Sequence, residues 1–152
     1  MQNFKKACFQ ECMCILENRL TSYEQDLNHL KETASNEQKS SMGDKYETTT
    51  ELLAQEREKI LSQIAEIKKQ INTLLKVEKS IDKPGNQIAQ GSLVKTDKAY
   101  FFISISLGKV ITEGKEVYVL SENAPMAKLF LNQTTGKSVT FNGVSHKIVG
   151  HS

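Results

Sequence analysis

The chain has 152 residues, of which 38% are hydrophobic and 25% are charged, and its formal net charge is +2. This composition is typical of a soluble protein with one or two small domains and excludes a disordered chain. No apolar run approaches the roughly 20 residues that a bilayer span requires. Glu11 and Glu17 interrupt the N-terminal segment, which therefore lacks the apolar stretch of a signal peptide. We expect a cytoplasmic protein that has no membrane partner.

Charge is unevenly distributed along the chain. Residues 37–58 contain 6 acidic and 3 basic side chains, whereas residues 84–152 contain 7 lysines and 4 acidic side chains. Proteins that wrap DNA carry continuous basic stripes, and this pattern has none. We therefore expect no sequence-specific DNA binding.

Two long segments before residue 84 repeat apolar residues at spacings that mostly alternate between three and four. This stripe with charged flanks is typical of a coiled coil, and a short polar link between the halves favours an antiparallel hairpin. We expect the hairpin over residues 1–83 and its acidic tip near residues 41–47. Arg57 takes the stripe position between Leu53 and Ile60, so the seam is expected to be interrupted near the tip. The stripes comprise Phe9, Met13, Leu16, Leu20, Tyr23, Leu27, Leu30 and Ala34, then Leu53, Ile60, Ile64, Ile67, Ile71 and Leu74.

A change of period after residue 84 predicts a second domain. Residues 84–91 are expected to be a linker, because a proline and a glycine end the second helix. Asn142 and Gly143 predict a type I′ hairpin turn, and a short helix is expected over residues 125–131, capped by Asn123. The result is an α+β chain whose residues 92–152 form a small antiparallel sheet domain with one short helix. Strands are expected at residues 92–94, 100–105, 109–111, 116–120, 138–141 and 145–149.

Three cysteines lie close together in the first helical segment. Cys8 and Cys12 are one helical turn apart, and Cys14 lies about 200° further round the helix. Three ligands on one straight helix cannot surround a tetrahedral zinc ion, and an odd number argues against a disulfide framework. We expect reduced cysteines that are partly packed.

Two carboxylates mark the predicted tip. Asp44 and Glu47 are three residues apart and would share one face at the start of the second helix. Such a pair also fits a capping box that stabilises the helix N-terminus. Two acids at an exposed tip are an incomplete Mg²⁺ site, because Mg²⁺ requires octahedral oxygen ligands that another macromolecule would have to supply. Lys45 and Tyr46 could contact a phosphate and a base, or be solvated.

The tip resembles a known family. Residues 43–47, Gly-Asp-Lys-Tyr-Glu, are similar to the Gly-Asp-x-x-Glu tip of the bacterial Gre transcript-cleavage factors. Residues 123–128, Asn-Ala-Pro-Met-Ala-Lys, and residues 136–139, Gly-Lys-Ser-Val, resemble the C-terminal pattern of that family. The order of hairpin, linker and small sheet domain also matches. The chain departs from the family at residues 48–51, which read Thr-Thr-Thr-Glu where Asn-Ala-Glu-Tyr is usual.

The resemblance implies a fold and a function. The C-terminal domain would be FKBP-like and would dock at the mouth of the secondary channel of bacterial RNA polymerase. Asp44 and Glu47 would help to hold the polymerase's second catalytic Mg²⁺, and Lys45 and Tyr46 would contact the nascent RNA 3′ end. The polymerase would then hydrolyse backtracked RNA, so the protein is expected to be a transcription elongation factor and a cofactor, not itself an enzyme. The residues expected to bind the polymerase are Asn123, Ala124, Pro125 and Met126.

Two other functions fit the same pattern. A regulator that only occupies the channel would use the same docking without stimulating cleavage. A coiled-coil interaction module unrelated to polymerase is compatible with the heptads alone.

Overall fold

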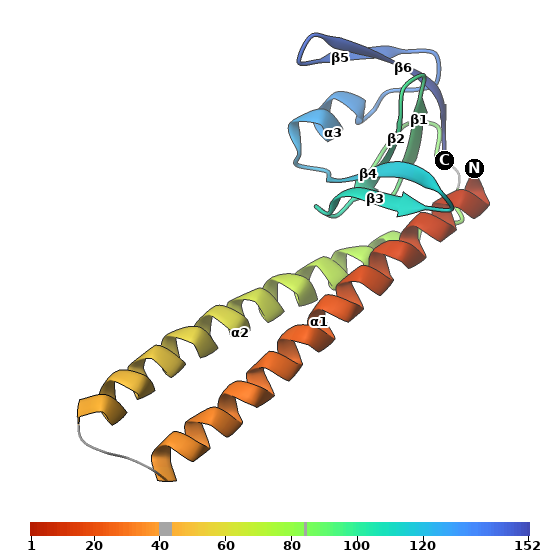
Figure 1. Cartoon of the computed structure of the whole chain (residues 1–152). Helices are drawn as coiled ribbons and strands as arrows, with labels where there is room; N and C mark the ends of the chain where they lie inside the picture. The colour runs from red at the N-terminus through yellow and green to blue at the C-terminus, as the bar shows by residue number, and fades with distance from the viewer. Residues whose placement is uncertain (40–43, 84) are drawn as a thin grey trace. The chain divides into compact units, whose positions relative to one another are not determined.

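A computed structural model describes residues 1–39, 44–83 and 85–152, and it confirms an α+β chain with a long helical hairpin followed by six strands (Figure 1). Among the described residues, no helix combines the length and the apolar character needed to span a bilayer. The elements are α1 (Gln2–Lys39), α2 (Asp44–Glu78), β1 (Leu93–Thr96), β2 (Tyr100–Ser104), β3 (Gly108–Thr112), β4 (Lys115–Ser121), α3 (Pro125–Phe130), β5 (Ser138–Phe141) and β6 (Val144–His151).

The chain forms two compact units. One unit combines Met1–Cys14 with Ile71–Ser152 and contains the whole sheet; we call it the sheet unit. The other unit is Ile15–Gln70 and contains the middle of both long helices; we call it the hairpin unit.

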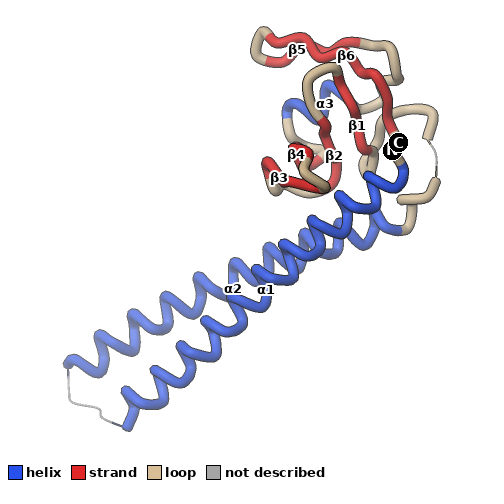
Figure 2. Tube along the Cα trace, turned by 45° about the vertical axis from the view of Figure 1, so that its right-hand side comes forward, coloured by secondary structure: helices blue, strands red, loops and turns tan. Residues whose placement is uncertain are grey.

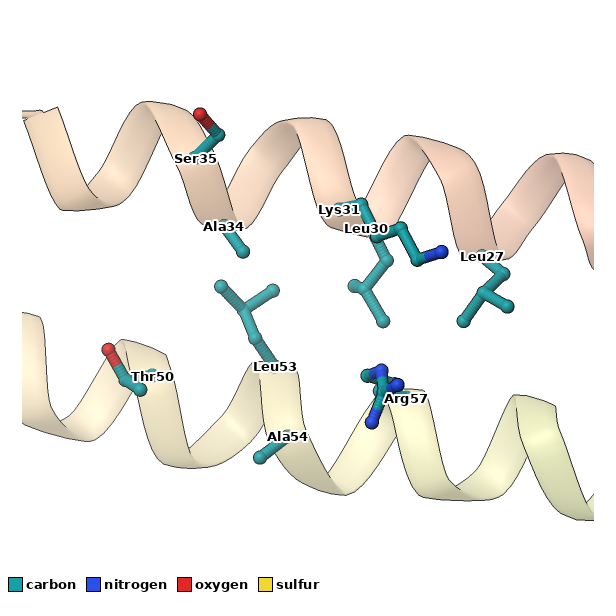
Figure 3. A pocket seen from close by; sticks show the side chains of 9 residues that line it. All are labelled: Leu27, Leu30, Lys31, Ala34, Ser35, Thr50, Leu53, Ala54 and Arg57. Atoms are coloured by element: carbon teal, nitrogen blue, oxygen red, sulfur yellow. The ribbon is translucent and has the colours of Figure 1, made fainter.

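In the hairpin unit, α1 and α2 lie side by side and run antiparallel (Figure 2). Ile60, Ile64 and Ile67 are buried in the seam, as the stripe predicts. At the stripe position that precedes Ile60, the side chain of Arg57 points toward α1, near Leu30 (Figure 3). An apolar-walled pocket of about 360 Å³ opens there between the two helices. The predicted interruption of the seam is therefore confirmed.

Filling this interruption should stabilise the hairpin. The Arg57→Leu variant replaces a charged side chain in an apolar pocket with one that can bury its surface, so we expect a gain of about 1 kcal/mol in the free energy of unfolding. Thermal unfolding followed by helical circular dichroism measures the gain. Glu58→Leu is the control, because both side chains are exposed on the same helix but only Arg57 lines the pocket. An equal gain in both variants would contradict the role of the pocket.

The six strands form a mixed sheet in the order β3-β4-β2-β1-β6-β5. The expectation of an antiparallel sheet is wrong at one pairing, because β2 and β4 are parallel. The chain reverses between β2 and β3 but leaves a strand's width between them, and β4 then folds back into that gap. A strand inserted between two antiparallel strands must run parallel to one of them, so the parallel pairing follows from the insertion.

Two tight turns connect the hairpins. Asn142 and Gly143 have φ values of 50° and 78°, so both central residues have the positive φ that a type I′ turn requires. Glu113 and Gly114 have φ values of 50° and 77° and join β3 to β4 in the same way. The turn predicted at Asn142 is confirmed, and it sets the register in which Phe141 pairs with Val144.

Helix α3 is present as predicted, but Asn123 is not its cap. The N-cap is Ala124, whose φ and ψ are −64° and 142° and which makes no side-chain capping hydrogen bond. A residue that precedes proline is driven into extended backbone, so Pro125 at the first helical position places the helix boundary at Ala124. Asn123 lies outside the helix, where its backbone N–H donates to Ser121 Oγ at 3.2 Å.

The segment between α2 and the sheet is partly built into the core. Helix α2 ends at Glu78, and the hydroxyl of Ser80 donates to the carbonyl oxygen of Val77 at 3.2 Å. Ile88, in the segment predicted to be a linker, is fully buried, and its N–H donates to the carbonyl oxygen of Gln133 at 2.9 Å. This segment therefore contributes both packing and backbone pairing to the sheet unit.

Strand β2 is buried toward both faces of the sheet. Successive side chains of a strand point to opposite faces, so Phe101 and Ile103 face one side and Phe102 and Ser104 face the other. Helix α3 covers the first side. The core cluster on that side comprises Ile88, Val94, Phe101, Ile103, Met126, Ala127, Phe130, Val139 and Ile148.

The first turns of α1 pack against the second side of the sheet. The ring of Phe4 meets the ring of Tyr100 edge-on, with centroids 5.0 Å apart. One turn further along α1, the buried Cys8 thiol lies beside the Thr112 hydroxyl of β3. The first turns of α1 therefore contact the second side of the sheet at both Tyr100 and Thr112.

Polar contacts hold the start of α1 to the residue that follows β6 and to the segment that follows α2. The hydroxyl of Ser152 donates to Gln2 Oε1 at 2.6 Å, and the amide of Gln2 donates to the carbonyl oxygen of Ile81. Lys6 and Asp82 form an ion pair of 2.6 Å, and this ammonium group holds the pKa of the Asp82 carboxyl below its ordinary value. The start of α1 is thus held from two sides.

Candidate functional site

The predicted acidic pair lies on the first turn of α2. Asp44 is the first residue of this helix and Glu47 follows three positions later, so helical geometry gives the two residues one face. Lys45 and Tyr46 lie on the same turn, between the two acids. Residues 40–43 and the side chains of residues 37–47 lie outside the described residues, so the positions of these four residues come from the helix backbone alone.

The two acids lie next to the link between the two long helices. Helix α1 ends at Lys39 and α2 begins at Asp44, so the acids stand where the hairpin reverses. A helix N-terminus carries partial positive charge and favours ionised carboxylates. The position of the acids on the first turn is therefore compatible both with a capping box and with binding of a metal ion.

The second predicted set, Asn123 to Met126, divides between surface and core. Asn123 and Pro125 are exposed and Ala124 is half-buried. Met126 is buried and packs in the core cluster under α3. Asn123 and Pro125 are thus the members of the set that a partner could touch directly, while Met126 supports the loop from below. The acidic pair belongs to the hairpin unit and this set belongs to the sheet unit.

The cysteines are placed as the helical spacing predicts. Cys8 and Cys12 are buried on one face of α1, and Cys14 is exposed on another. Burial raises the pKa of the Cys8 thiol to about 11 and that of the Cys12 thiol to about 12. Within the described residues, no three His, Cys, Asp or Glu side chains gather as a metal-binding group.

These pKa values predict unequal thiol reactivity. The thiolate is the reactive species, and a raised pKa keeps Cys8 and Cys12 protonated at pH 8, well below pH 11. We expect a disulfide reagent to modify Cys14 rapidly and the other two only after unfolding. Counting fast-reacting thiols in the wild type and in Cys14→Ser tests this, and a fast-reacting thiol in Cys14→Ser would contradict it.

Sequence reasoning missed a group of residues that the fold brings together from four elements. The ammonium group of Lys95 is 5.7 Å from the centre of the Tyr100 ring, and that of Lys115 is 5.7 Å from the same ring. Lys115 is also 5.0 Å from the centre of the Phe4 ring. Lys95 and Tyr100 pair across the β1–β2 hairpin, a relation that the sequence hints at, but the contacts of Phe4 and Lys115 depend on tertiary folding.

Comparison with protein-family models, with curated proteins and with solved structures gives no match for this chain.

Proposed function

We propose that the protein is a transcription elongation factor that enters the secondary channel of bacterial RNA polymerase and stimulates Mg²⁺-dependent cleavage of backtracked RNA. It would act in the cytoplasm, as a cofactor of the polymerase's own hydrolysis. The observation that carries the proposal is the placement of Asp44 and Glu47 on one helical turn where the hairpin reverses. A carboxylate pair at such a position can be presented to the active site of another macromolecule.

The donor set suits a shared magnesium ion. Two carboxylates supply part of an octahedral oxygen shell, and the polymerase and the RNA phosphates would supply the rest. When bound, the ion would supply charge stabilisation for phosphodiester hydrolysis. Asp44 and Glu47 would hold the ion and orient the attacking water, while Lys45 and Tyr46 would contact the RNA 3′ end.

The sheet unit would dock on the polymerase through the exposed residues that precede α3. Asn123 and Pro125 are accessible there, and the buried Met126 and Ala127 anchor the following helix in the core. An FKBP-like relationship of this unit is part of the same proposal. Its support is a six-stranded mixed sheet with one short helix packed on one face.

Removing the acidic charges should abolish cleavage and leave binding intact. In a stalled, backtracked elongation complex with 3′-labelled RNA and Mg²⁺, we expect Asp44→Asn/Glu47→Gln to lower the cleavage rate about 100-fold or more, since removal of a single charge-stabilising group costs that much. Glu51→Gln/Glu58→Gln is the matched control, because both side chains are exposed on α2. It should cleave like the wild type.

Each of the other possible outcomes of the cleavage experiment would point to a different role. Unchanged cleavage by the Asp44 and Glu47 variant would refute the proposed role of the acids. Inhibited RNA synthesis without RNA shortening would favour the regulator that only occupies the channel, which the Thr-Thr-Thr sequence at residues 48–50 makes the second candidate. Absence of polymerase binding would leave a coiled-coil interaction module.

The docking loop can be tested separately. Asn123→Arg should weaken polymerase binding about tenfold, because a large charged side chain in a contact surface costs on the order of 1.4 kcal/mol or more. Its thermal stability should be unchanged, since Asn123 is exposed and does not cap α3. Thr140→Arg adds the same charge at an exposed position of β5 and should bind normally. Equal binding by both variants would exclude the loop before α3 as the docking surface.

A further inference from the structure

The sheet unit contains a hollow where lysine side chains and aromatic rings meet. It has a volume of about 490 Å³, and its walls include Met1, Phe4, Lys95, Tyr100 and Lys115. A second hollow of about 410 Å³ shares Lys95, Tyr100 and Lys115 and extends to Tyr118. Both volumes fall within the roughly 300–1,000 Å³ that is typical of ligand sites. We call the two adjoining hollows the lysine–tyrosine groove.

Strand register explains why these side chains converge. Lys95 lies opposite Tyr100 in the β1–β2 pair, and Tyr100 lies opposite Val117 in the β2–β4 pair. Lys115 precedes Val117 by two residues in β4 and therefore points to the same face. The first turn of α1 then brings Phe4 against Tyr100, which closes one wall.

The two central lysines are available to a ligand. Among the described residues, neither Lys95 nor Lys115 forms an ion pair, and their recorded partners are the rings of Tyr100 and Phe4.

The carboxylates that line the second hollow already have partners. Asp97 accepts from the N–H of Lys147 at 2.9 Å and pairs with Lys98 at 3.5 Å. Glu116 pairs with Lys109 at 3.3 Å. Neither carboxylate therefore neutralises the lysines at the centre of the groove.

We propose that the lysine–tyrosine groove binds single-stranded nucleic acid, with the ammonium groups of Lys95 and Lys115 on backbone phosphates and bases stacked on Tyr100 and Phe4. A cationic groove with interleaved aromatic rings is the arrangement that binds single strands without sequence preference. Two adjoining hollows suit a chain of more than one nucleotide better than one small anion. An acidic peptide would satisfy the lysines but would make no use of the rings of Tyr100 and Phe4, which lie beside both ammonium groups.

This site lies outside the proposed acidic tip and does not depend on the cleavage function. The oligouridylate titration contains no polymerase and reports on the groove, whereas the cleavage assay reports on the two acids. Failure of the cleavage proposal and failure of the groove proposal are thus distinguishable.

The test is fluorescence anisotropy of a short labelled oligouridylate titrated with the full chain. We expect Lys95→Gln/Lys115→Gln to weaken binding at least about tenfold and to reduce the slope of log Kd against log salt by about 1.4, because each phosphate contact on a single strand contributes about 0.7. Tyr100→Leu should weaken binding about tenfold through lost stacking. Circular dichroism checks that each variant is folded, and Lys115→Gln alone, with about half of the change in slope, serves if Tyr100→Leu unfolds.

The matched control is Lys128→Gln/Lys137→Gln, which removes the same charge from exposed positions of the sheet unit that do not line the groove. It should change affinity less than twofold. Absence of oligouridylate binding, or an equal loss in the control, would overturn the proposal. Displacement of the oligouridylate by an oligoglutamate of equal charge at equal concentration would also overturn it and assign the groove to acidic polypeptides.

Discussion

The burial of β2 on both faces is the constraint on which the sheet unit depends. Phe102 and Ile103 are neighbours in the sequence, point in opposite directions, and are both fully buried. An α3 of six residues can cover only one side of the sheet. The other side must be covered by something else, and the first turns of α1 contribute, because Phe4 and Cys8 contact Tyr100 and Thr112 there. Because an uncovered Phe102 would expose a large apolar surface, the sheet requires the hairpin base.

This requirement explains the polar fastening around the start of α1. Packing alone is non-directional and would allow the helix to slide along the sheet. The contact of Gln2 with Ser152 and the ion pair of Lys6 with Asp82 hold α1 to the residue after β6 and to the segment after α2. The ion pair of Lys6 is exposed, so it contributes more to the placement of α1 than to the free energy of unfolding. The aromatic contact between Phe4 and Tyr100, and with it one wall of the groove, depends on this placement.

The elements with local signals could be predicted from the sequence. Period-two stretches located all six strands, and Asn142-Gly143 located its turn, because strand alternation and positive φ act over a few residues. The parallel β2–β4 pairing could not be predicted, since the strand inserted between β2 and β3 comes later in the chain. Asparagine favours the N-cap position, but Pro125 drives the residue before it into extended backbone, so the cap is Ala124 and not Asn123.

The two candidate sites also differ in whether local sequence signals reveal them. The acids at Asp44 and Glu47 were found because their spacing and their place between two helical patterns are both local features. The groove was missed because Phe4, Lys95 and Lys115 have no shared pattern and meet only through strand register and α1 docking. Lysines on a strand are usually solvated, and only their position over aromatic rings, with no ion pair recorded among the described residues, distinguishes these two. A helix that is needed to complete the core thus also completes a surface where cations and rings converge, so the groove is a consequence of how β2 is buried.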